Sequence, residues 1–249
     1  MDHDSNVQSI DYATRLQNLR DRLATLARPD VRIIAVSKTH GPEAIRRLLE
    51  LGQRDFGENR QNEARDKFPL VALRDLIPEQ QPIYHHIGPL QSGNARQIPG
   101  LFQYVHGVSD WKALDVLLKS AQKRIPRDYS SELPFLSYLI QVRLTDEAGK
   151  AGGMPPAEIL NRNRFPENEA VSFRGFMCMG PENQDPIETR AVFQRLRAIR
   201  DGIDPTLELS MGMSGDWEIA VAEGATMIRV GTLLFGPRAG APWHPQSEA

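Results

Sequence analysis

The sequence predicts an α/β protein built as a single (β/α)8 barrel of the TIM type with one extra helix at its N-terminus. Eight short β-branched or apolar runs recur along the chain, and stretches with helical spacing lie between most of them. Strands that alternate with helices pair in parallel through right-handed crossovers. The chain has 249 residues, and a barrel of this type takes about 250. A doubly wound open sheet is the alternative that this pattern leaves open.

The extra helix is expected over Ser9–Ala27. Its apolar residues are spaced mostly by three and four positions, which is typical of an amphipathic helix, and Pro29 ends the pattern. These apolar residues are Ile10, Tyr12, Leu16, Leu19, Leu23 and Leu26.

The eight strands are predicted where apolar runs are bounded by glycine, proline or polar residues. They are Val31–Ser37, Asp55–Glu58, Ile83–Gly88, Tyr104–Val108, Phe135–Leu144, Ser172–Met179, Leu207–Met211 and Met227–Leu234. Helical spacing is found mostly in the segments between them. These are Glu43–Leu51, Gln61–Lys67, Gly93–Ile98, Trp111–Arg124, Pro155–Asn161, Ile187–Asp201 and Asp216–Glu223.

Composition indicates an ordinary soluble globular protein, since 40% of the residues are hydrophobic and 25% are charged. The net charge of -2 argues against a nucleic-acid or anionic-membrane partner. Cys178 is the single cysteine, so no intrachain disulfide forms, and a cytoplasmic location is expected. The N-terminus is polar, and no apolar run reaches the roughly 20 residues that span a bilayer. We expect one domain over residues 1–249, with flexible ends at 1–8 and 239–249.

Lys38 closes the first predicted strand and is followed by Thr-His-Gly-Pro. The carboxyl ends of the strands carry the chemistry of α/β barrels. A lysine amine placed there can lose its proton and form a Schiff base with an aldehyde. The structural alternative is a lysine that caps the strand and pairs with a nearby carboxylate.

The second and third strands end in polar residues. Asn59 follows a glycine and a glutamate, and its amide can donate and accept hydrogen bonds. His85 and His86 are adjacent, so they point to opposite faces of a strand and cannot share one metal ion without a bulge. We therefore expect no metal site, with one histidine at the barrel mouth and the other among the helices.

The seventh and eighth strands lead into a predicted anion site. Ser214 precedes a helical segment, and Gly231 and Thr232 offer backbone N–H groups and a hydroxyl at the exit of the eighth strand. Barrels commonly bind phosphate at these two loops. Arg229 lies within the eighth strand, where it either serves this site or forms a core ion pair.

Other motifs do not apply. The segment around Lys150 lacks the upstream glycine and the following hydroxyl of a P-loop, and no GxGxxG is present. Glycines do not flank Ser214 as in a nucleophile elbow. Cys178 lies in an apolar strand, which favours packing over nucleophilic chemistry.

An amine beside a phosphate site fits a phosphorylated aldehyde, and pyridoxal 5'-phosphate is the leading candidate. A class I sugar-phosphate aldolase remains an alternative.

Six segments, in order from the first strand to the last, closely resemble the YggS/PROSC family of pyridoxal phosphate homeostasis proteins. They are Ala35–Lys38, Phe56–Asn59, His85–Gln91, Arg174–Met177, Leu209–Ser214 and Arg229–Gly236. The resemblance implies a single-domain barrel like the N-terminal domain of alanine racemase. It also implies that the cofactor is held as an internal aldimine, without established catalysis, and that the protein contributes to vitamin B6 balance.

The resemblance assigns roles to seven residues. Lys38 is expected to carry the aldimine, Ser214, Gly231 and Thr232 to hold the phosphate, and Asn59 and Met211 to line the cofactor. Arg229 is expected near the pyridine nitrogen or the phosphate, and the sequence leaves this choice open.

This chain also departs from the family pattern. The segment after the third strand, Gln91–Arg96, lacks a lysine that the family usually has, and His86 replaces an aromatic residue. These changes leave the expectation of cofactor binding intact but weaken any transfer of partner behaviour.

The resemblance favours a binding protein over an enzyme. In alanine racemases a tyrosine from the partner subunit's second domain supplies the second acid or base, and no such domain is expected after the eighth strand here. Tyr84, Tyr104 and Tyr138 are strand residues expected to be packed. An arginine at the pyridine nitrogen would also weaken the ring as an electron sink. We expect a monomer that makes transient contact with PLP-dependent apoenzymes, while weak racemase or transaminase activity is the alternative.

Overall fold

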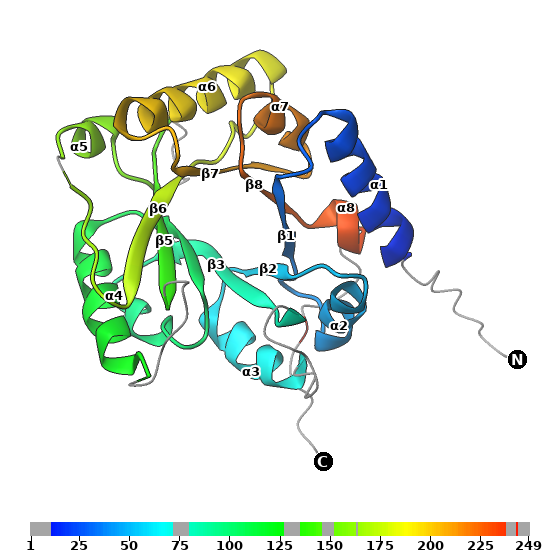
Figure 1. Cartoon of the computed structure of the whole chain (residues 1–249), viewed down its shortest axis with the longest axis horizontal. Helices are drawn as coiled ribbons and strands as arrows, with labels where there is room; N and C mark the ends of the chain where they lie inside the picture. Colours follow the sequence, from blue (N-terminus) through cyan, green and yellow to red (C-terminus); the bar gives the residue numbers. More distant parts are fainter. Residues whose placement is uncertain are drawn as a thin grey trace, which may run out of the picture.

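A computed structural model of the chain shows a closed barrel of eight parallel strands in the order β1 to β8. The structure describes residues 11–71, 80–126, 135–145, 152–162, 164–237 and 243. Helices surround the ring of strands (Figure 1). Strand β1 pairs with both β2 and β8, which closes the ring and excludes the open-sheet alternative.

The strands are β1 (Arg32–Val36), β2 (Asp55–Glu58), β3 (Ile83–Leu90), β4 (Tyr104–Val108), β5 (Leu136–Gln141), β6 (Val171–Met177), β7 (Glu208–Met213) and β8 (Met227–Val230). The helices are α1 (Tyr12–Thr25), α2 (Pro42–Glu50), α3 (Gln61–Val71), the 3-10 turn η2 (Ala95–Gln97), α4 (Trp111–Arg124), α5 (Pro156–Leu160), α6 (Pro186–Ile203), α7 (Trp217–Ala222) and α8 (Thr232–Phe235).

The extra N-terminal helix is confirmed as α1. Asp11 caps it by accepting a hydrogen bond from the N–H of Thr14 at 2.9 Å. Leu16, Leu19 and Leu23 form its buried face. The expected flexible ends lie outside the described residues, except for Trp243, whose N–H donates to the carbonyl oxygen of Thr39 at 3.1 Å.

The predicted bounds of β2, β4 and α4 match the structure, but the eighth strand was predicted too long. Strand β8 ends at Val230, and Thr232–Phe235 forms the short helix α8. The cause is that apolar residues continue on both sides of Gly231 and Thr232, up to Phe235, and hydrophobic periodicity cannot separate a buried strand from a buried helix in so short a segment. Helix α3 also continues past Lys67, through Pro69, to Val71.

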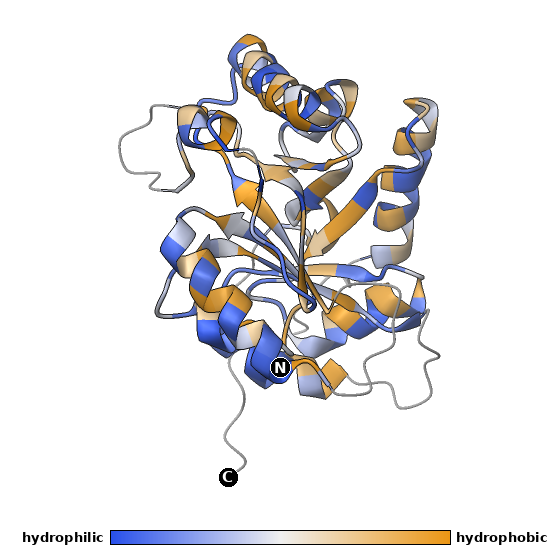
Figure 2. Cartoon of the chain, turned by 60° about the vertical axis from the view of Figure 1, so that its left-hand side comes forward, coloured by the Kyte–Doolittle hydropathy of each residue, from blue (hydrophilic) through white to orange (hydrophobic). Residues whose placement is uncertain are grey.

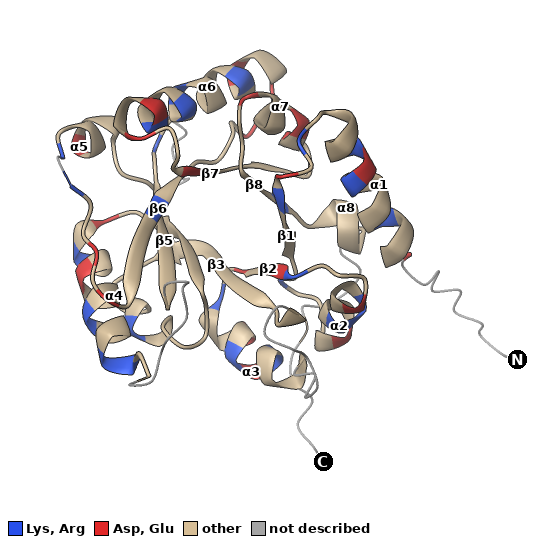
Figure 3. Ribbon diagram, in the orientation of Figure 1, with Lys and Arg blue, Asp and Glu red and all other residues tan. Residues whose placement is uncertain are grey.

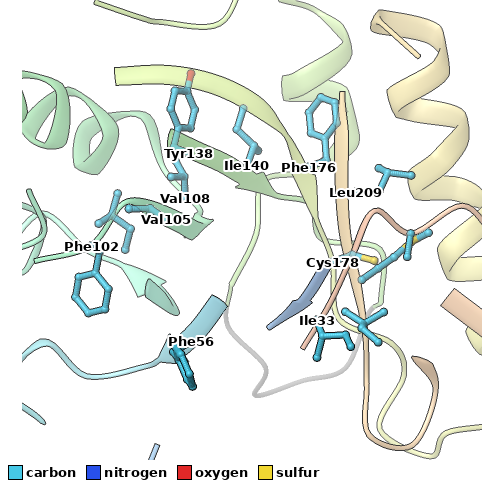
Figure 4. Packing of buried hydrophobic residues seen from close by; sticks show 14 of the residues in the cluster. Ile33, Phe56, Phe102, Val105, Val108, Tyr138, Ile140, Phe176, Cys178 and Leu209 are labelled. Atoms are coloured by element: carbon cyan, nitrogen blue, oxygen red, sulfur yellow. The ribbon is translucent and has the colours of Figure 1, made fainter. Parts of the chain in front are cut away.

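Most of the core lies between the strands and the surrounding helices. Outward residues such as Phe56, Tyr138 and Phe176 are fully buried in this layer. The strands are largely hydrophobic, whereas the helices mix both kinds of residue (Figure 2). Cys178 lies among the buried side chains, close to Leu209 (Figure 4). Burial raises the pKa of the Cys178 thiol to about 12, so this cysteine serves packing, as predicted.

A second, smaller cluster fills part of the barrel interior. It consists of Ile34, Leu139, Met177 and Met227. The interior also holds polar residues, and Figure 3 shows charged residues on strands β1, β2 and β7 as well as on the helices. In the part of the chain that the structure describes, no helix is long and apolar enough to cross a bilayer.

Candidate functional site

The candidate site lies where the barrel closes between β1 and β8. Ala35 pairs with Val230 across the closure. Ala35 stands three residues before Lys38, and Val230 stands one residue before Gly231. A side-chain carbon built on Gly231 would lie 3.6 Å from the carbonyl oxygen of Val36. Barrel closure therefore brings the predicted Schiff-base lysine and the predicted phosphate loop to one edge, although 193 positions of sequence separate them.

Lys38 lies in a tight turn whose backbone is held on both sides. The N–H of His40 donates to the carbonyl oxygen of Ser37 at 3.0 Å, which closes the turn around Lys38. Lys67 Nζ donates to the same carbonyl oxygen at 3.0 Å. The N–H of Thr39 donates to Glu63 Oε1 at 2.6 Å. Thr39 has a φ of 71°, a left-handed conformation that costs free energy in a β-branched residue.

A buried ion cluster supports this turn. Lys67 Nζ pairs with Glu58 Oε1 at 2.8 Å and with Glu63 Oε1 at 2.7 Å, and the side chains of Lys67 and Glu58 are fully buried. Ser37 Oγ donates to Glu58 Oε1 at 2.8 Å. Burial raises the pKa of Glu58 to about 7 and outweighs the opposing effect of Lys67.

Glu58 and Glu63, the two carboxylates of this cluster, both pair with Lys67. Lys67 and Glu63 were not predicted as supports of the turn. The available signal was Lys67 itself, which stands four positions after Glu63 on one helical face.

The predicted phosphate residues lie together at the end of β7 and the start of α8. The N–H of Gly231 donates to Ser214 Oγ at 3.2 Å. Gly231 is the cap residue that precedes α8, and Thr232 is the first residue of that helix. Backbone N–H groups at a helix start and two hydroxyls form a donor set suited to an anion.

Arg229 lies inside the barrel beneath this loop. Its Nη1 donates to the carbonyl oxygen of Ser210 at 2.9 Å and to Ser210 Oγ at 2.6 Å, and its Nη2 donates to the carbonyl oxygen of Cys178 at 3.0 Å. Burial lowers the pKa of Arg229, although nearby Cys178 and Asp216 oppose this shift. These three acceptors are neutral, so the predicted alternative of a core ion pair does not account for how the guanidinium is held.

The two predicted lining residues differ in exposure. Asn59 follows β2 directly and is partly exposed. A side-chain carbon built on Gly88 would lie 2.5 Å from the carbonyl oxygen of Asn59, so the ends of β2 and β3 approach closely. Met211 is fully buried in β7, within the large core cluster.

The two histidines point to opposite faces of β3, as predicted. His86 packs outside the barrel, where Phe102 lies against it and Gln61 Nε2 lies 3.2 Å from its Nε2. Burial lowers the pKa of His86 to about 4. The prediction that one histidine faces the mouth is wrong, because His85 is fully buried in the interior and bonds to Asp55 and His106. Among the described residues no cluster of histidine, cysteine and carboxylates could hold a metal ion.

The donor set fits a phosphorylated aldehyde. Ser214 and Gly231 offer a hydroxyl and an N–H group 3.2 Å apart, and the buried Arg229 guanidinium lies below them. A buried cation with neutral partners is stabilised by an anion at the mouth. Lys38, in the turn that follows the adjacent strand β1, supplies an amine.

Comparison with known proteins gives one consistent family. The sequence model of the protein family described as alanine racemase, N-terminal domain, matches residues 10–239. The pyridoxal phosphate homeostasis protein of Pseudomonas aeruginosa is 39% identical over 218 residues, which cover 85% of this chain and 87% of that protein. The protein of the same name from Escherichia coli K12 is 31% identical and covers 92% of this chain and 97% of its own length.

Solved structures agree. PipY of Synechococcus elongatus, determined with PLP bound, has a TM-score of 0.74 and 36% identity, with 91% of this chain and all of PipY covered. An alanine racemase from Clostridium difficile has a TM-score of 0.66 at 13% identity, covering 96% of this chain and 58% of that enzyme. At that identity the likeness concerns the barrel fold alone.

Proposed function

The chain belongs to the alanine racemase N-terminal domain family and, within it, to the pyridoxal phosphate homeostasis proteins, and we propose that it binds pyridoxal 5'-phosphate without turning over a substrate. The observation that carries this proposal is the juxtaposition of Lys38 with the Ser214–Gly231 pair at the β1–β8 closure. PipY, which was solved with PLP bound, covers 91% of this chain and supports the choice of cofactor.

In this proposal Lys38 Nζ would hold the cofactor by condensing with its aldehyde group, whose oxygen would leave as water. The turn around Lys38 keeps its backbone fixed, because Lys67 and Glu63 hold the residues on either side. Ser214, Gly231 and Thr232 donate to the phosphate. Arg229 contributes positive charge beneath the pocket, and Asn59 and Met211 line it. The bound cofactor supplies an electrophilic aldehyde and an aromatic ring.

The tyrosines support a binding role over racemisation. A racemase needs a second acid or base on the opposite face of its substrate. Tyr138 donates to the carbonyl oxygen of Pro166 at 2.8 Å, and Tyr84 stacks on Phe68 outside the barrel. Tyr104 lies inside, where Arg32 packs on its ring. Each of these three tyrosines has a packing or hydrogen-bonding partner within the fold.

The protein would then serve vitamin B6 balance in the cytoplasm as a monomer that transfers its cofactor through transient contact with apoenzymes. A weak racemase or transaminase is the competing function, favoured by the shared fold with alanine racemases.

One experiment separates the two functions. The protein is saturated with pyridoxal phosphate, and each common amino acid is added in deuterated water while proton exchange at its α-carbon is followed by NMR. The proposal predicts that exchange matches the rate with free cofactor. Faster exchange that disappears in Lys38→Ala would establish an enzyme.

A further inference from the structure

A continuous chain of hydrogen bonds crosses the barrel interior below the candidate site. Asp55 Oδ1 lies 2.8 Å from His85 Nε2, and His85 Nδ1 lies 2.9 Å from His106 Nε2. His106 Nδ1 lies 2.8 Å from Ser210 Oγ, which accepts from Arg229 Nη1 at 2.6 Å. The five residues come from strands β2, β3, β4, β7 and β8, so the chain links side chains that only barrel closure brings together.

The two ends of the chain fix the direction of every hydrogen bond in it. Arg229 can only donate, so Ser210 Oγ accepts there and turns its own hydrogen toward His106 Nδ1. A neutral His106 then carries its hydrogen on Nε2 and donates to His85 Nδ1. His85 in turn donates through Nε2 to the Asp55 carboxylate. This assignment of the histidine hydrogens follows from the hydrogen-bond pattern.

The electrostatic surroundings support neutral histidines. Burial lowers the pKa of His85, and it lowers the pKa of His106 well below the usual value. Burial alone would raise the pKa of Asp55, but its bond to His85 and the charge of Arg32 lower it to about 2. Tyr104 stacks on His85, and Glu208 lies 3.6 Å from Arg32 at the same end of the barrel. The chain thus runs from the Arg229 cation to the Asp55 anion through two neutral rings.

We propose that His106 and His85 are positioning residues for the cofactor pocket, because they hold the Ser210 hydroxyl as an acceptor and thereby fix the Arg229 guanidinium in one orientation. This inference rests on the proposed function and deepens it. Nη1 donates to the carbonyl oxygen and to the Oγ of Ser210, and Nη2 donates to the carbonyl oxygen of Cys178. These three hydrogen bonds fix the orientation of the guanidinium plane before a ligand binds.

A purely structural role makes a different prediction. If the hydrogen-bond chain only satisfies buried polar groups, breaking it lowers the free energy of unfolding and leaves the pocket of the folded protein unchanged. A positioning role instead changes what the bound cofactor experiences. Cofactor affinity and the pH at which its absorption spectrum changes distinguish the two roles.

The first readout needs no cofactor. NMR of the protein labelled with nitrogen-15 at histidine reports which ring nitrogen carries the hydrogen. We expect His85 and His106 both to be neutral with the hydrogen on Nε2. A hydrogen on Nδ1 of either ring, or a charged ring at neutral pH, would contradict the hydrogen-bond directions inferred here and with them the positioning role.

The second readout uses pyridoxal phosphate with His106→Phe, which keeps an aromatic ring but removes both nitrogen atoms. We expect about tenfold weaker binding, the loss that corresponds to one net hydrogen bond, together with a displaced pH midpoint of the cofactor spectrum. His106→Gln, whose amide offers one donor and one acceptor, should recover part of the affinity. Ser210→Ala breaks the same chain by removing a single hydroxyl and serves if His106→Phe fails to fold.

Tyr104→Phe is the matched control, because Tyr104 packs on His85 but is not a member of the chain. It should bind the cofactor as the wild type does. Unchanged affinity and pH midpoint in both His106→Phe and Ser210→Ala would overturn the positioning role. Failure of the wild type to bind the cofactor would overturn the proposed function and the positioning role together, and the NMR result would then report on the hydrogen-bond chain alone.

Discussion

The backbone N–H of Thr39 donates to Glu63 Oε1 at 2.6 Å, so helix α3 holds the residue that directly follows Lys38. The same carboxylate oxygen accepts from Lys67 Nζ, which also binds the carbonyl oxygen of Ser37. The two peptide groups that flank Lys38 therefore share one buried support. Fixing the backbone in this way reduces the conformational freedom that the lysine would lose on bonding to a ligand.

Replacing Glu63 with glutamine should loosen this support. Glu63→Gln removes the charge that stabilises Lys67 and weakens the acceptor for Thr39, which is held at a φ of 71°. We expect pyridoxal phosphate to bind about tenfold more weakly, as measured by equilibrium titration. Glu43→Gln is the control, because Glu43 is 75% exposed on α2. Wild-type affinity in Glu63→Gln would show that the support does not matter for binding.

Glu58 should make stability depend on pH. Its pKa is raised from 4.5 to about 7 by burial, so the folded state binds more protons than the unfolded state between these values. Its contribution to the free energy of unfolding is therefore fully present below about 4.5 and is lost as the pH rises through about 7.

Glu58→Gln removes this titration. Urea denaturation across the same pH range should show the variant gaining stability relative to wild type as the pH rises, by an amount on the order of 3 kcal/mol. A difference that is constant with pH would mean that Glu58 titrates normally in the folded protein.

Ser214→Ala tests the phosphate loop. The hydroxyl lies 3.2 Å from the Gly231 nitrogen and is proposed to donate to the phosphate. A hydrogen bond to a charged group contributes roughly 1.5–3 kcal/mol, so affinity for pyridoxal phosphate should fall at least tenfold. Binding of pyridoxal, which lacks the phosphate, is the control and should stay the same. An equal loss for both ligands would place Ser214 outside the phosphate site.

A variant far from the site should change stability without changing binding. Asp185 caps helix α6 by accepting from the N–H groups of Ile187 and Glu188, each at 2.9 Å. Asp185→Ala should cost about 1 kcal/mol of unfolding free energy and lower the melting temperature by roughly 2–4 °C. Calorimetry measures the shift, and cofactor titration should match the wild type. An unchanged melting temperature would argue that the cap is not needed.

Much of the barrel could be predicted because the local signals are strong. The predicted bounds of β2, β4 and α4 match the observed ones; β4 carries two β-branched valines, and α4 has helical spacing. The end of β8 was missed, because Gly231 is followed by an apolar segment that fits either a strand or a helix. No local pattern separates these two possibilities.

The supporting residues were harder to predict than the candidate site residues. Lys38, Ser214 and Gly231 stand at strand ends, where chemistry is expected. Lys67 and Glu63 support the turn around Lys38 from helix α3, and this pairing depends on tertiary packing. The interior chain is similar, because Asp55 and Arg229 are 174 positions apart and are linked only when the barrel closes. The sequence did contain one indication of this hydrogen-bond chain, namely polar residues within strands that are otherwise buried.

The most direct test of the account is to find the residue that bonds to the cofactor. The protein is incubated with pyridoxal phosphate, reduced with borohydride, digested with trypsin and analysed by mass spectrometry, with Lys38→Ala treated in parallel. We expect a visible absorption band that reduction abolishes and a pyridoxyl group on the peptide that contains Lys38. We also expect to find neither in the variant. A modified Lys67, or a wild-type protein that stays colourless with added cofactor, would contradict this expectation.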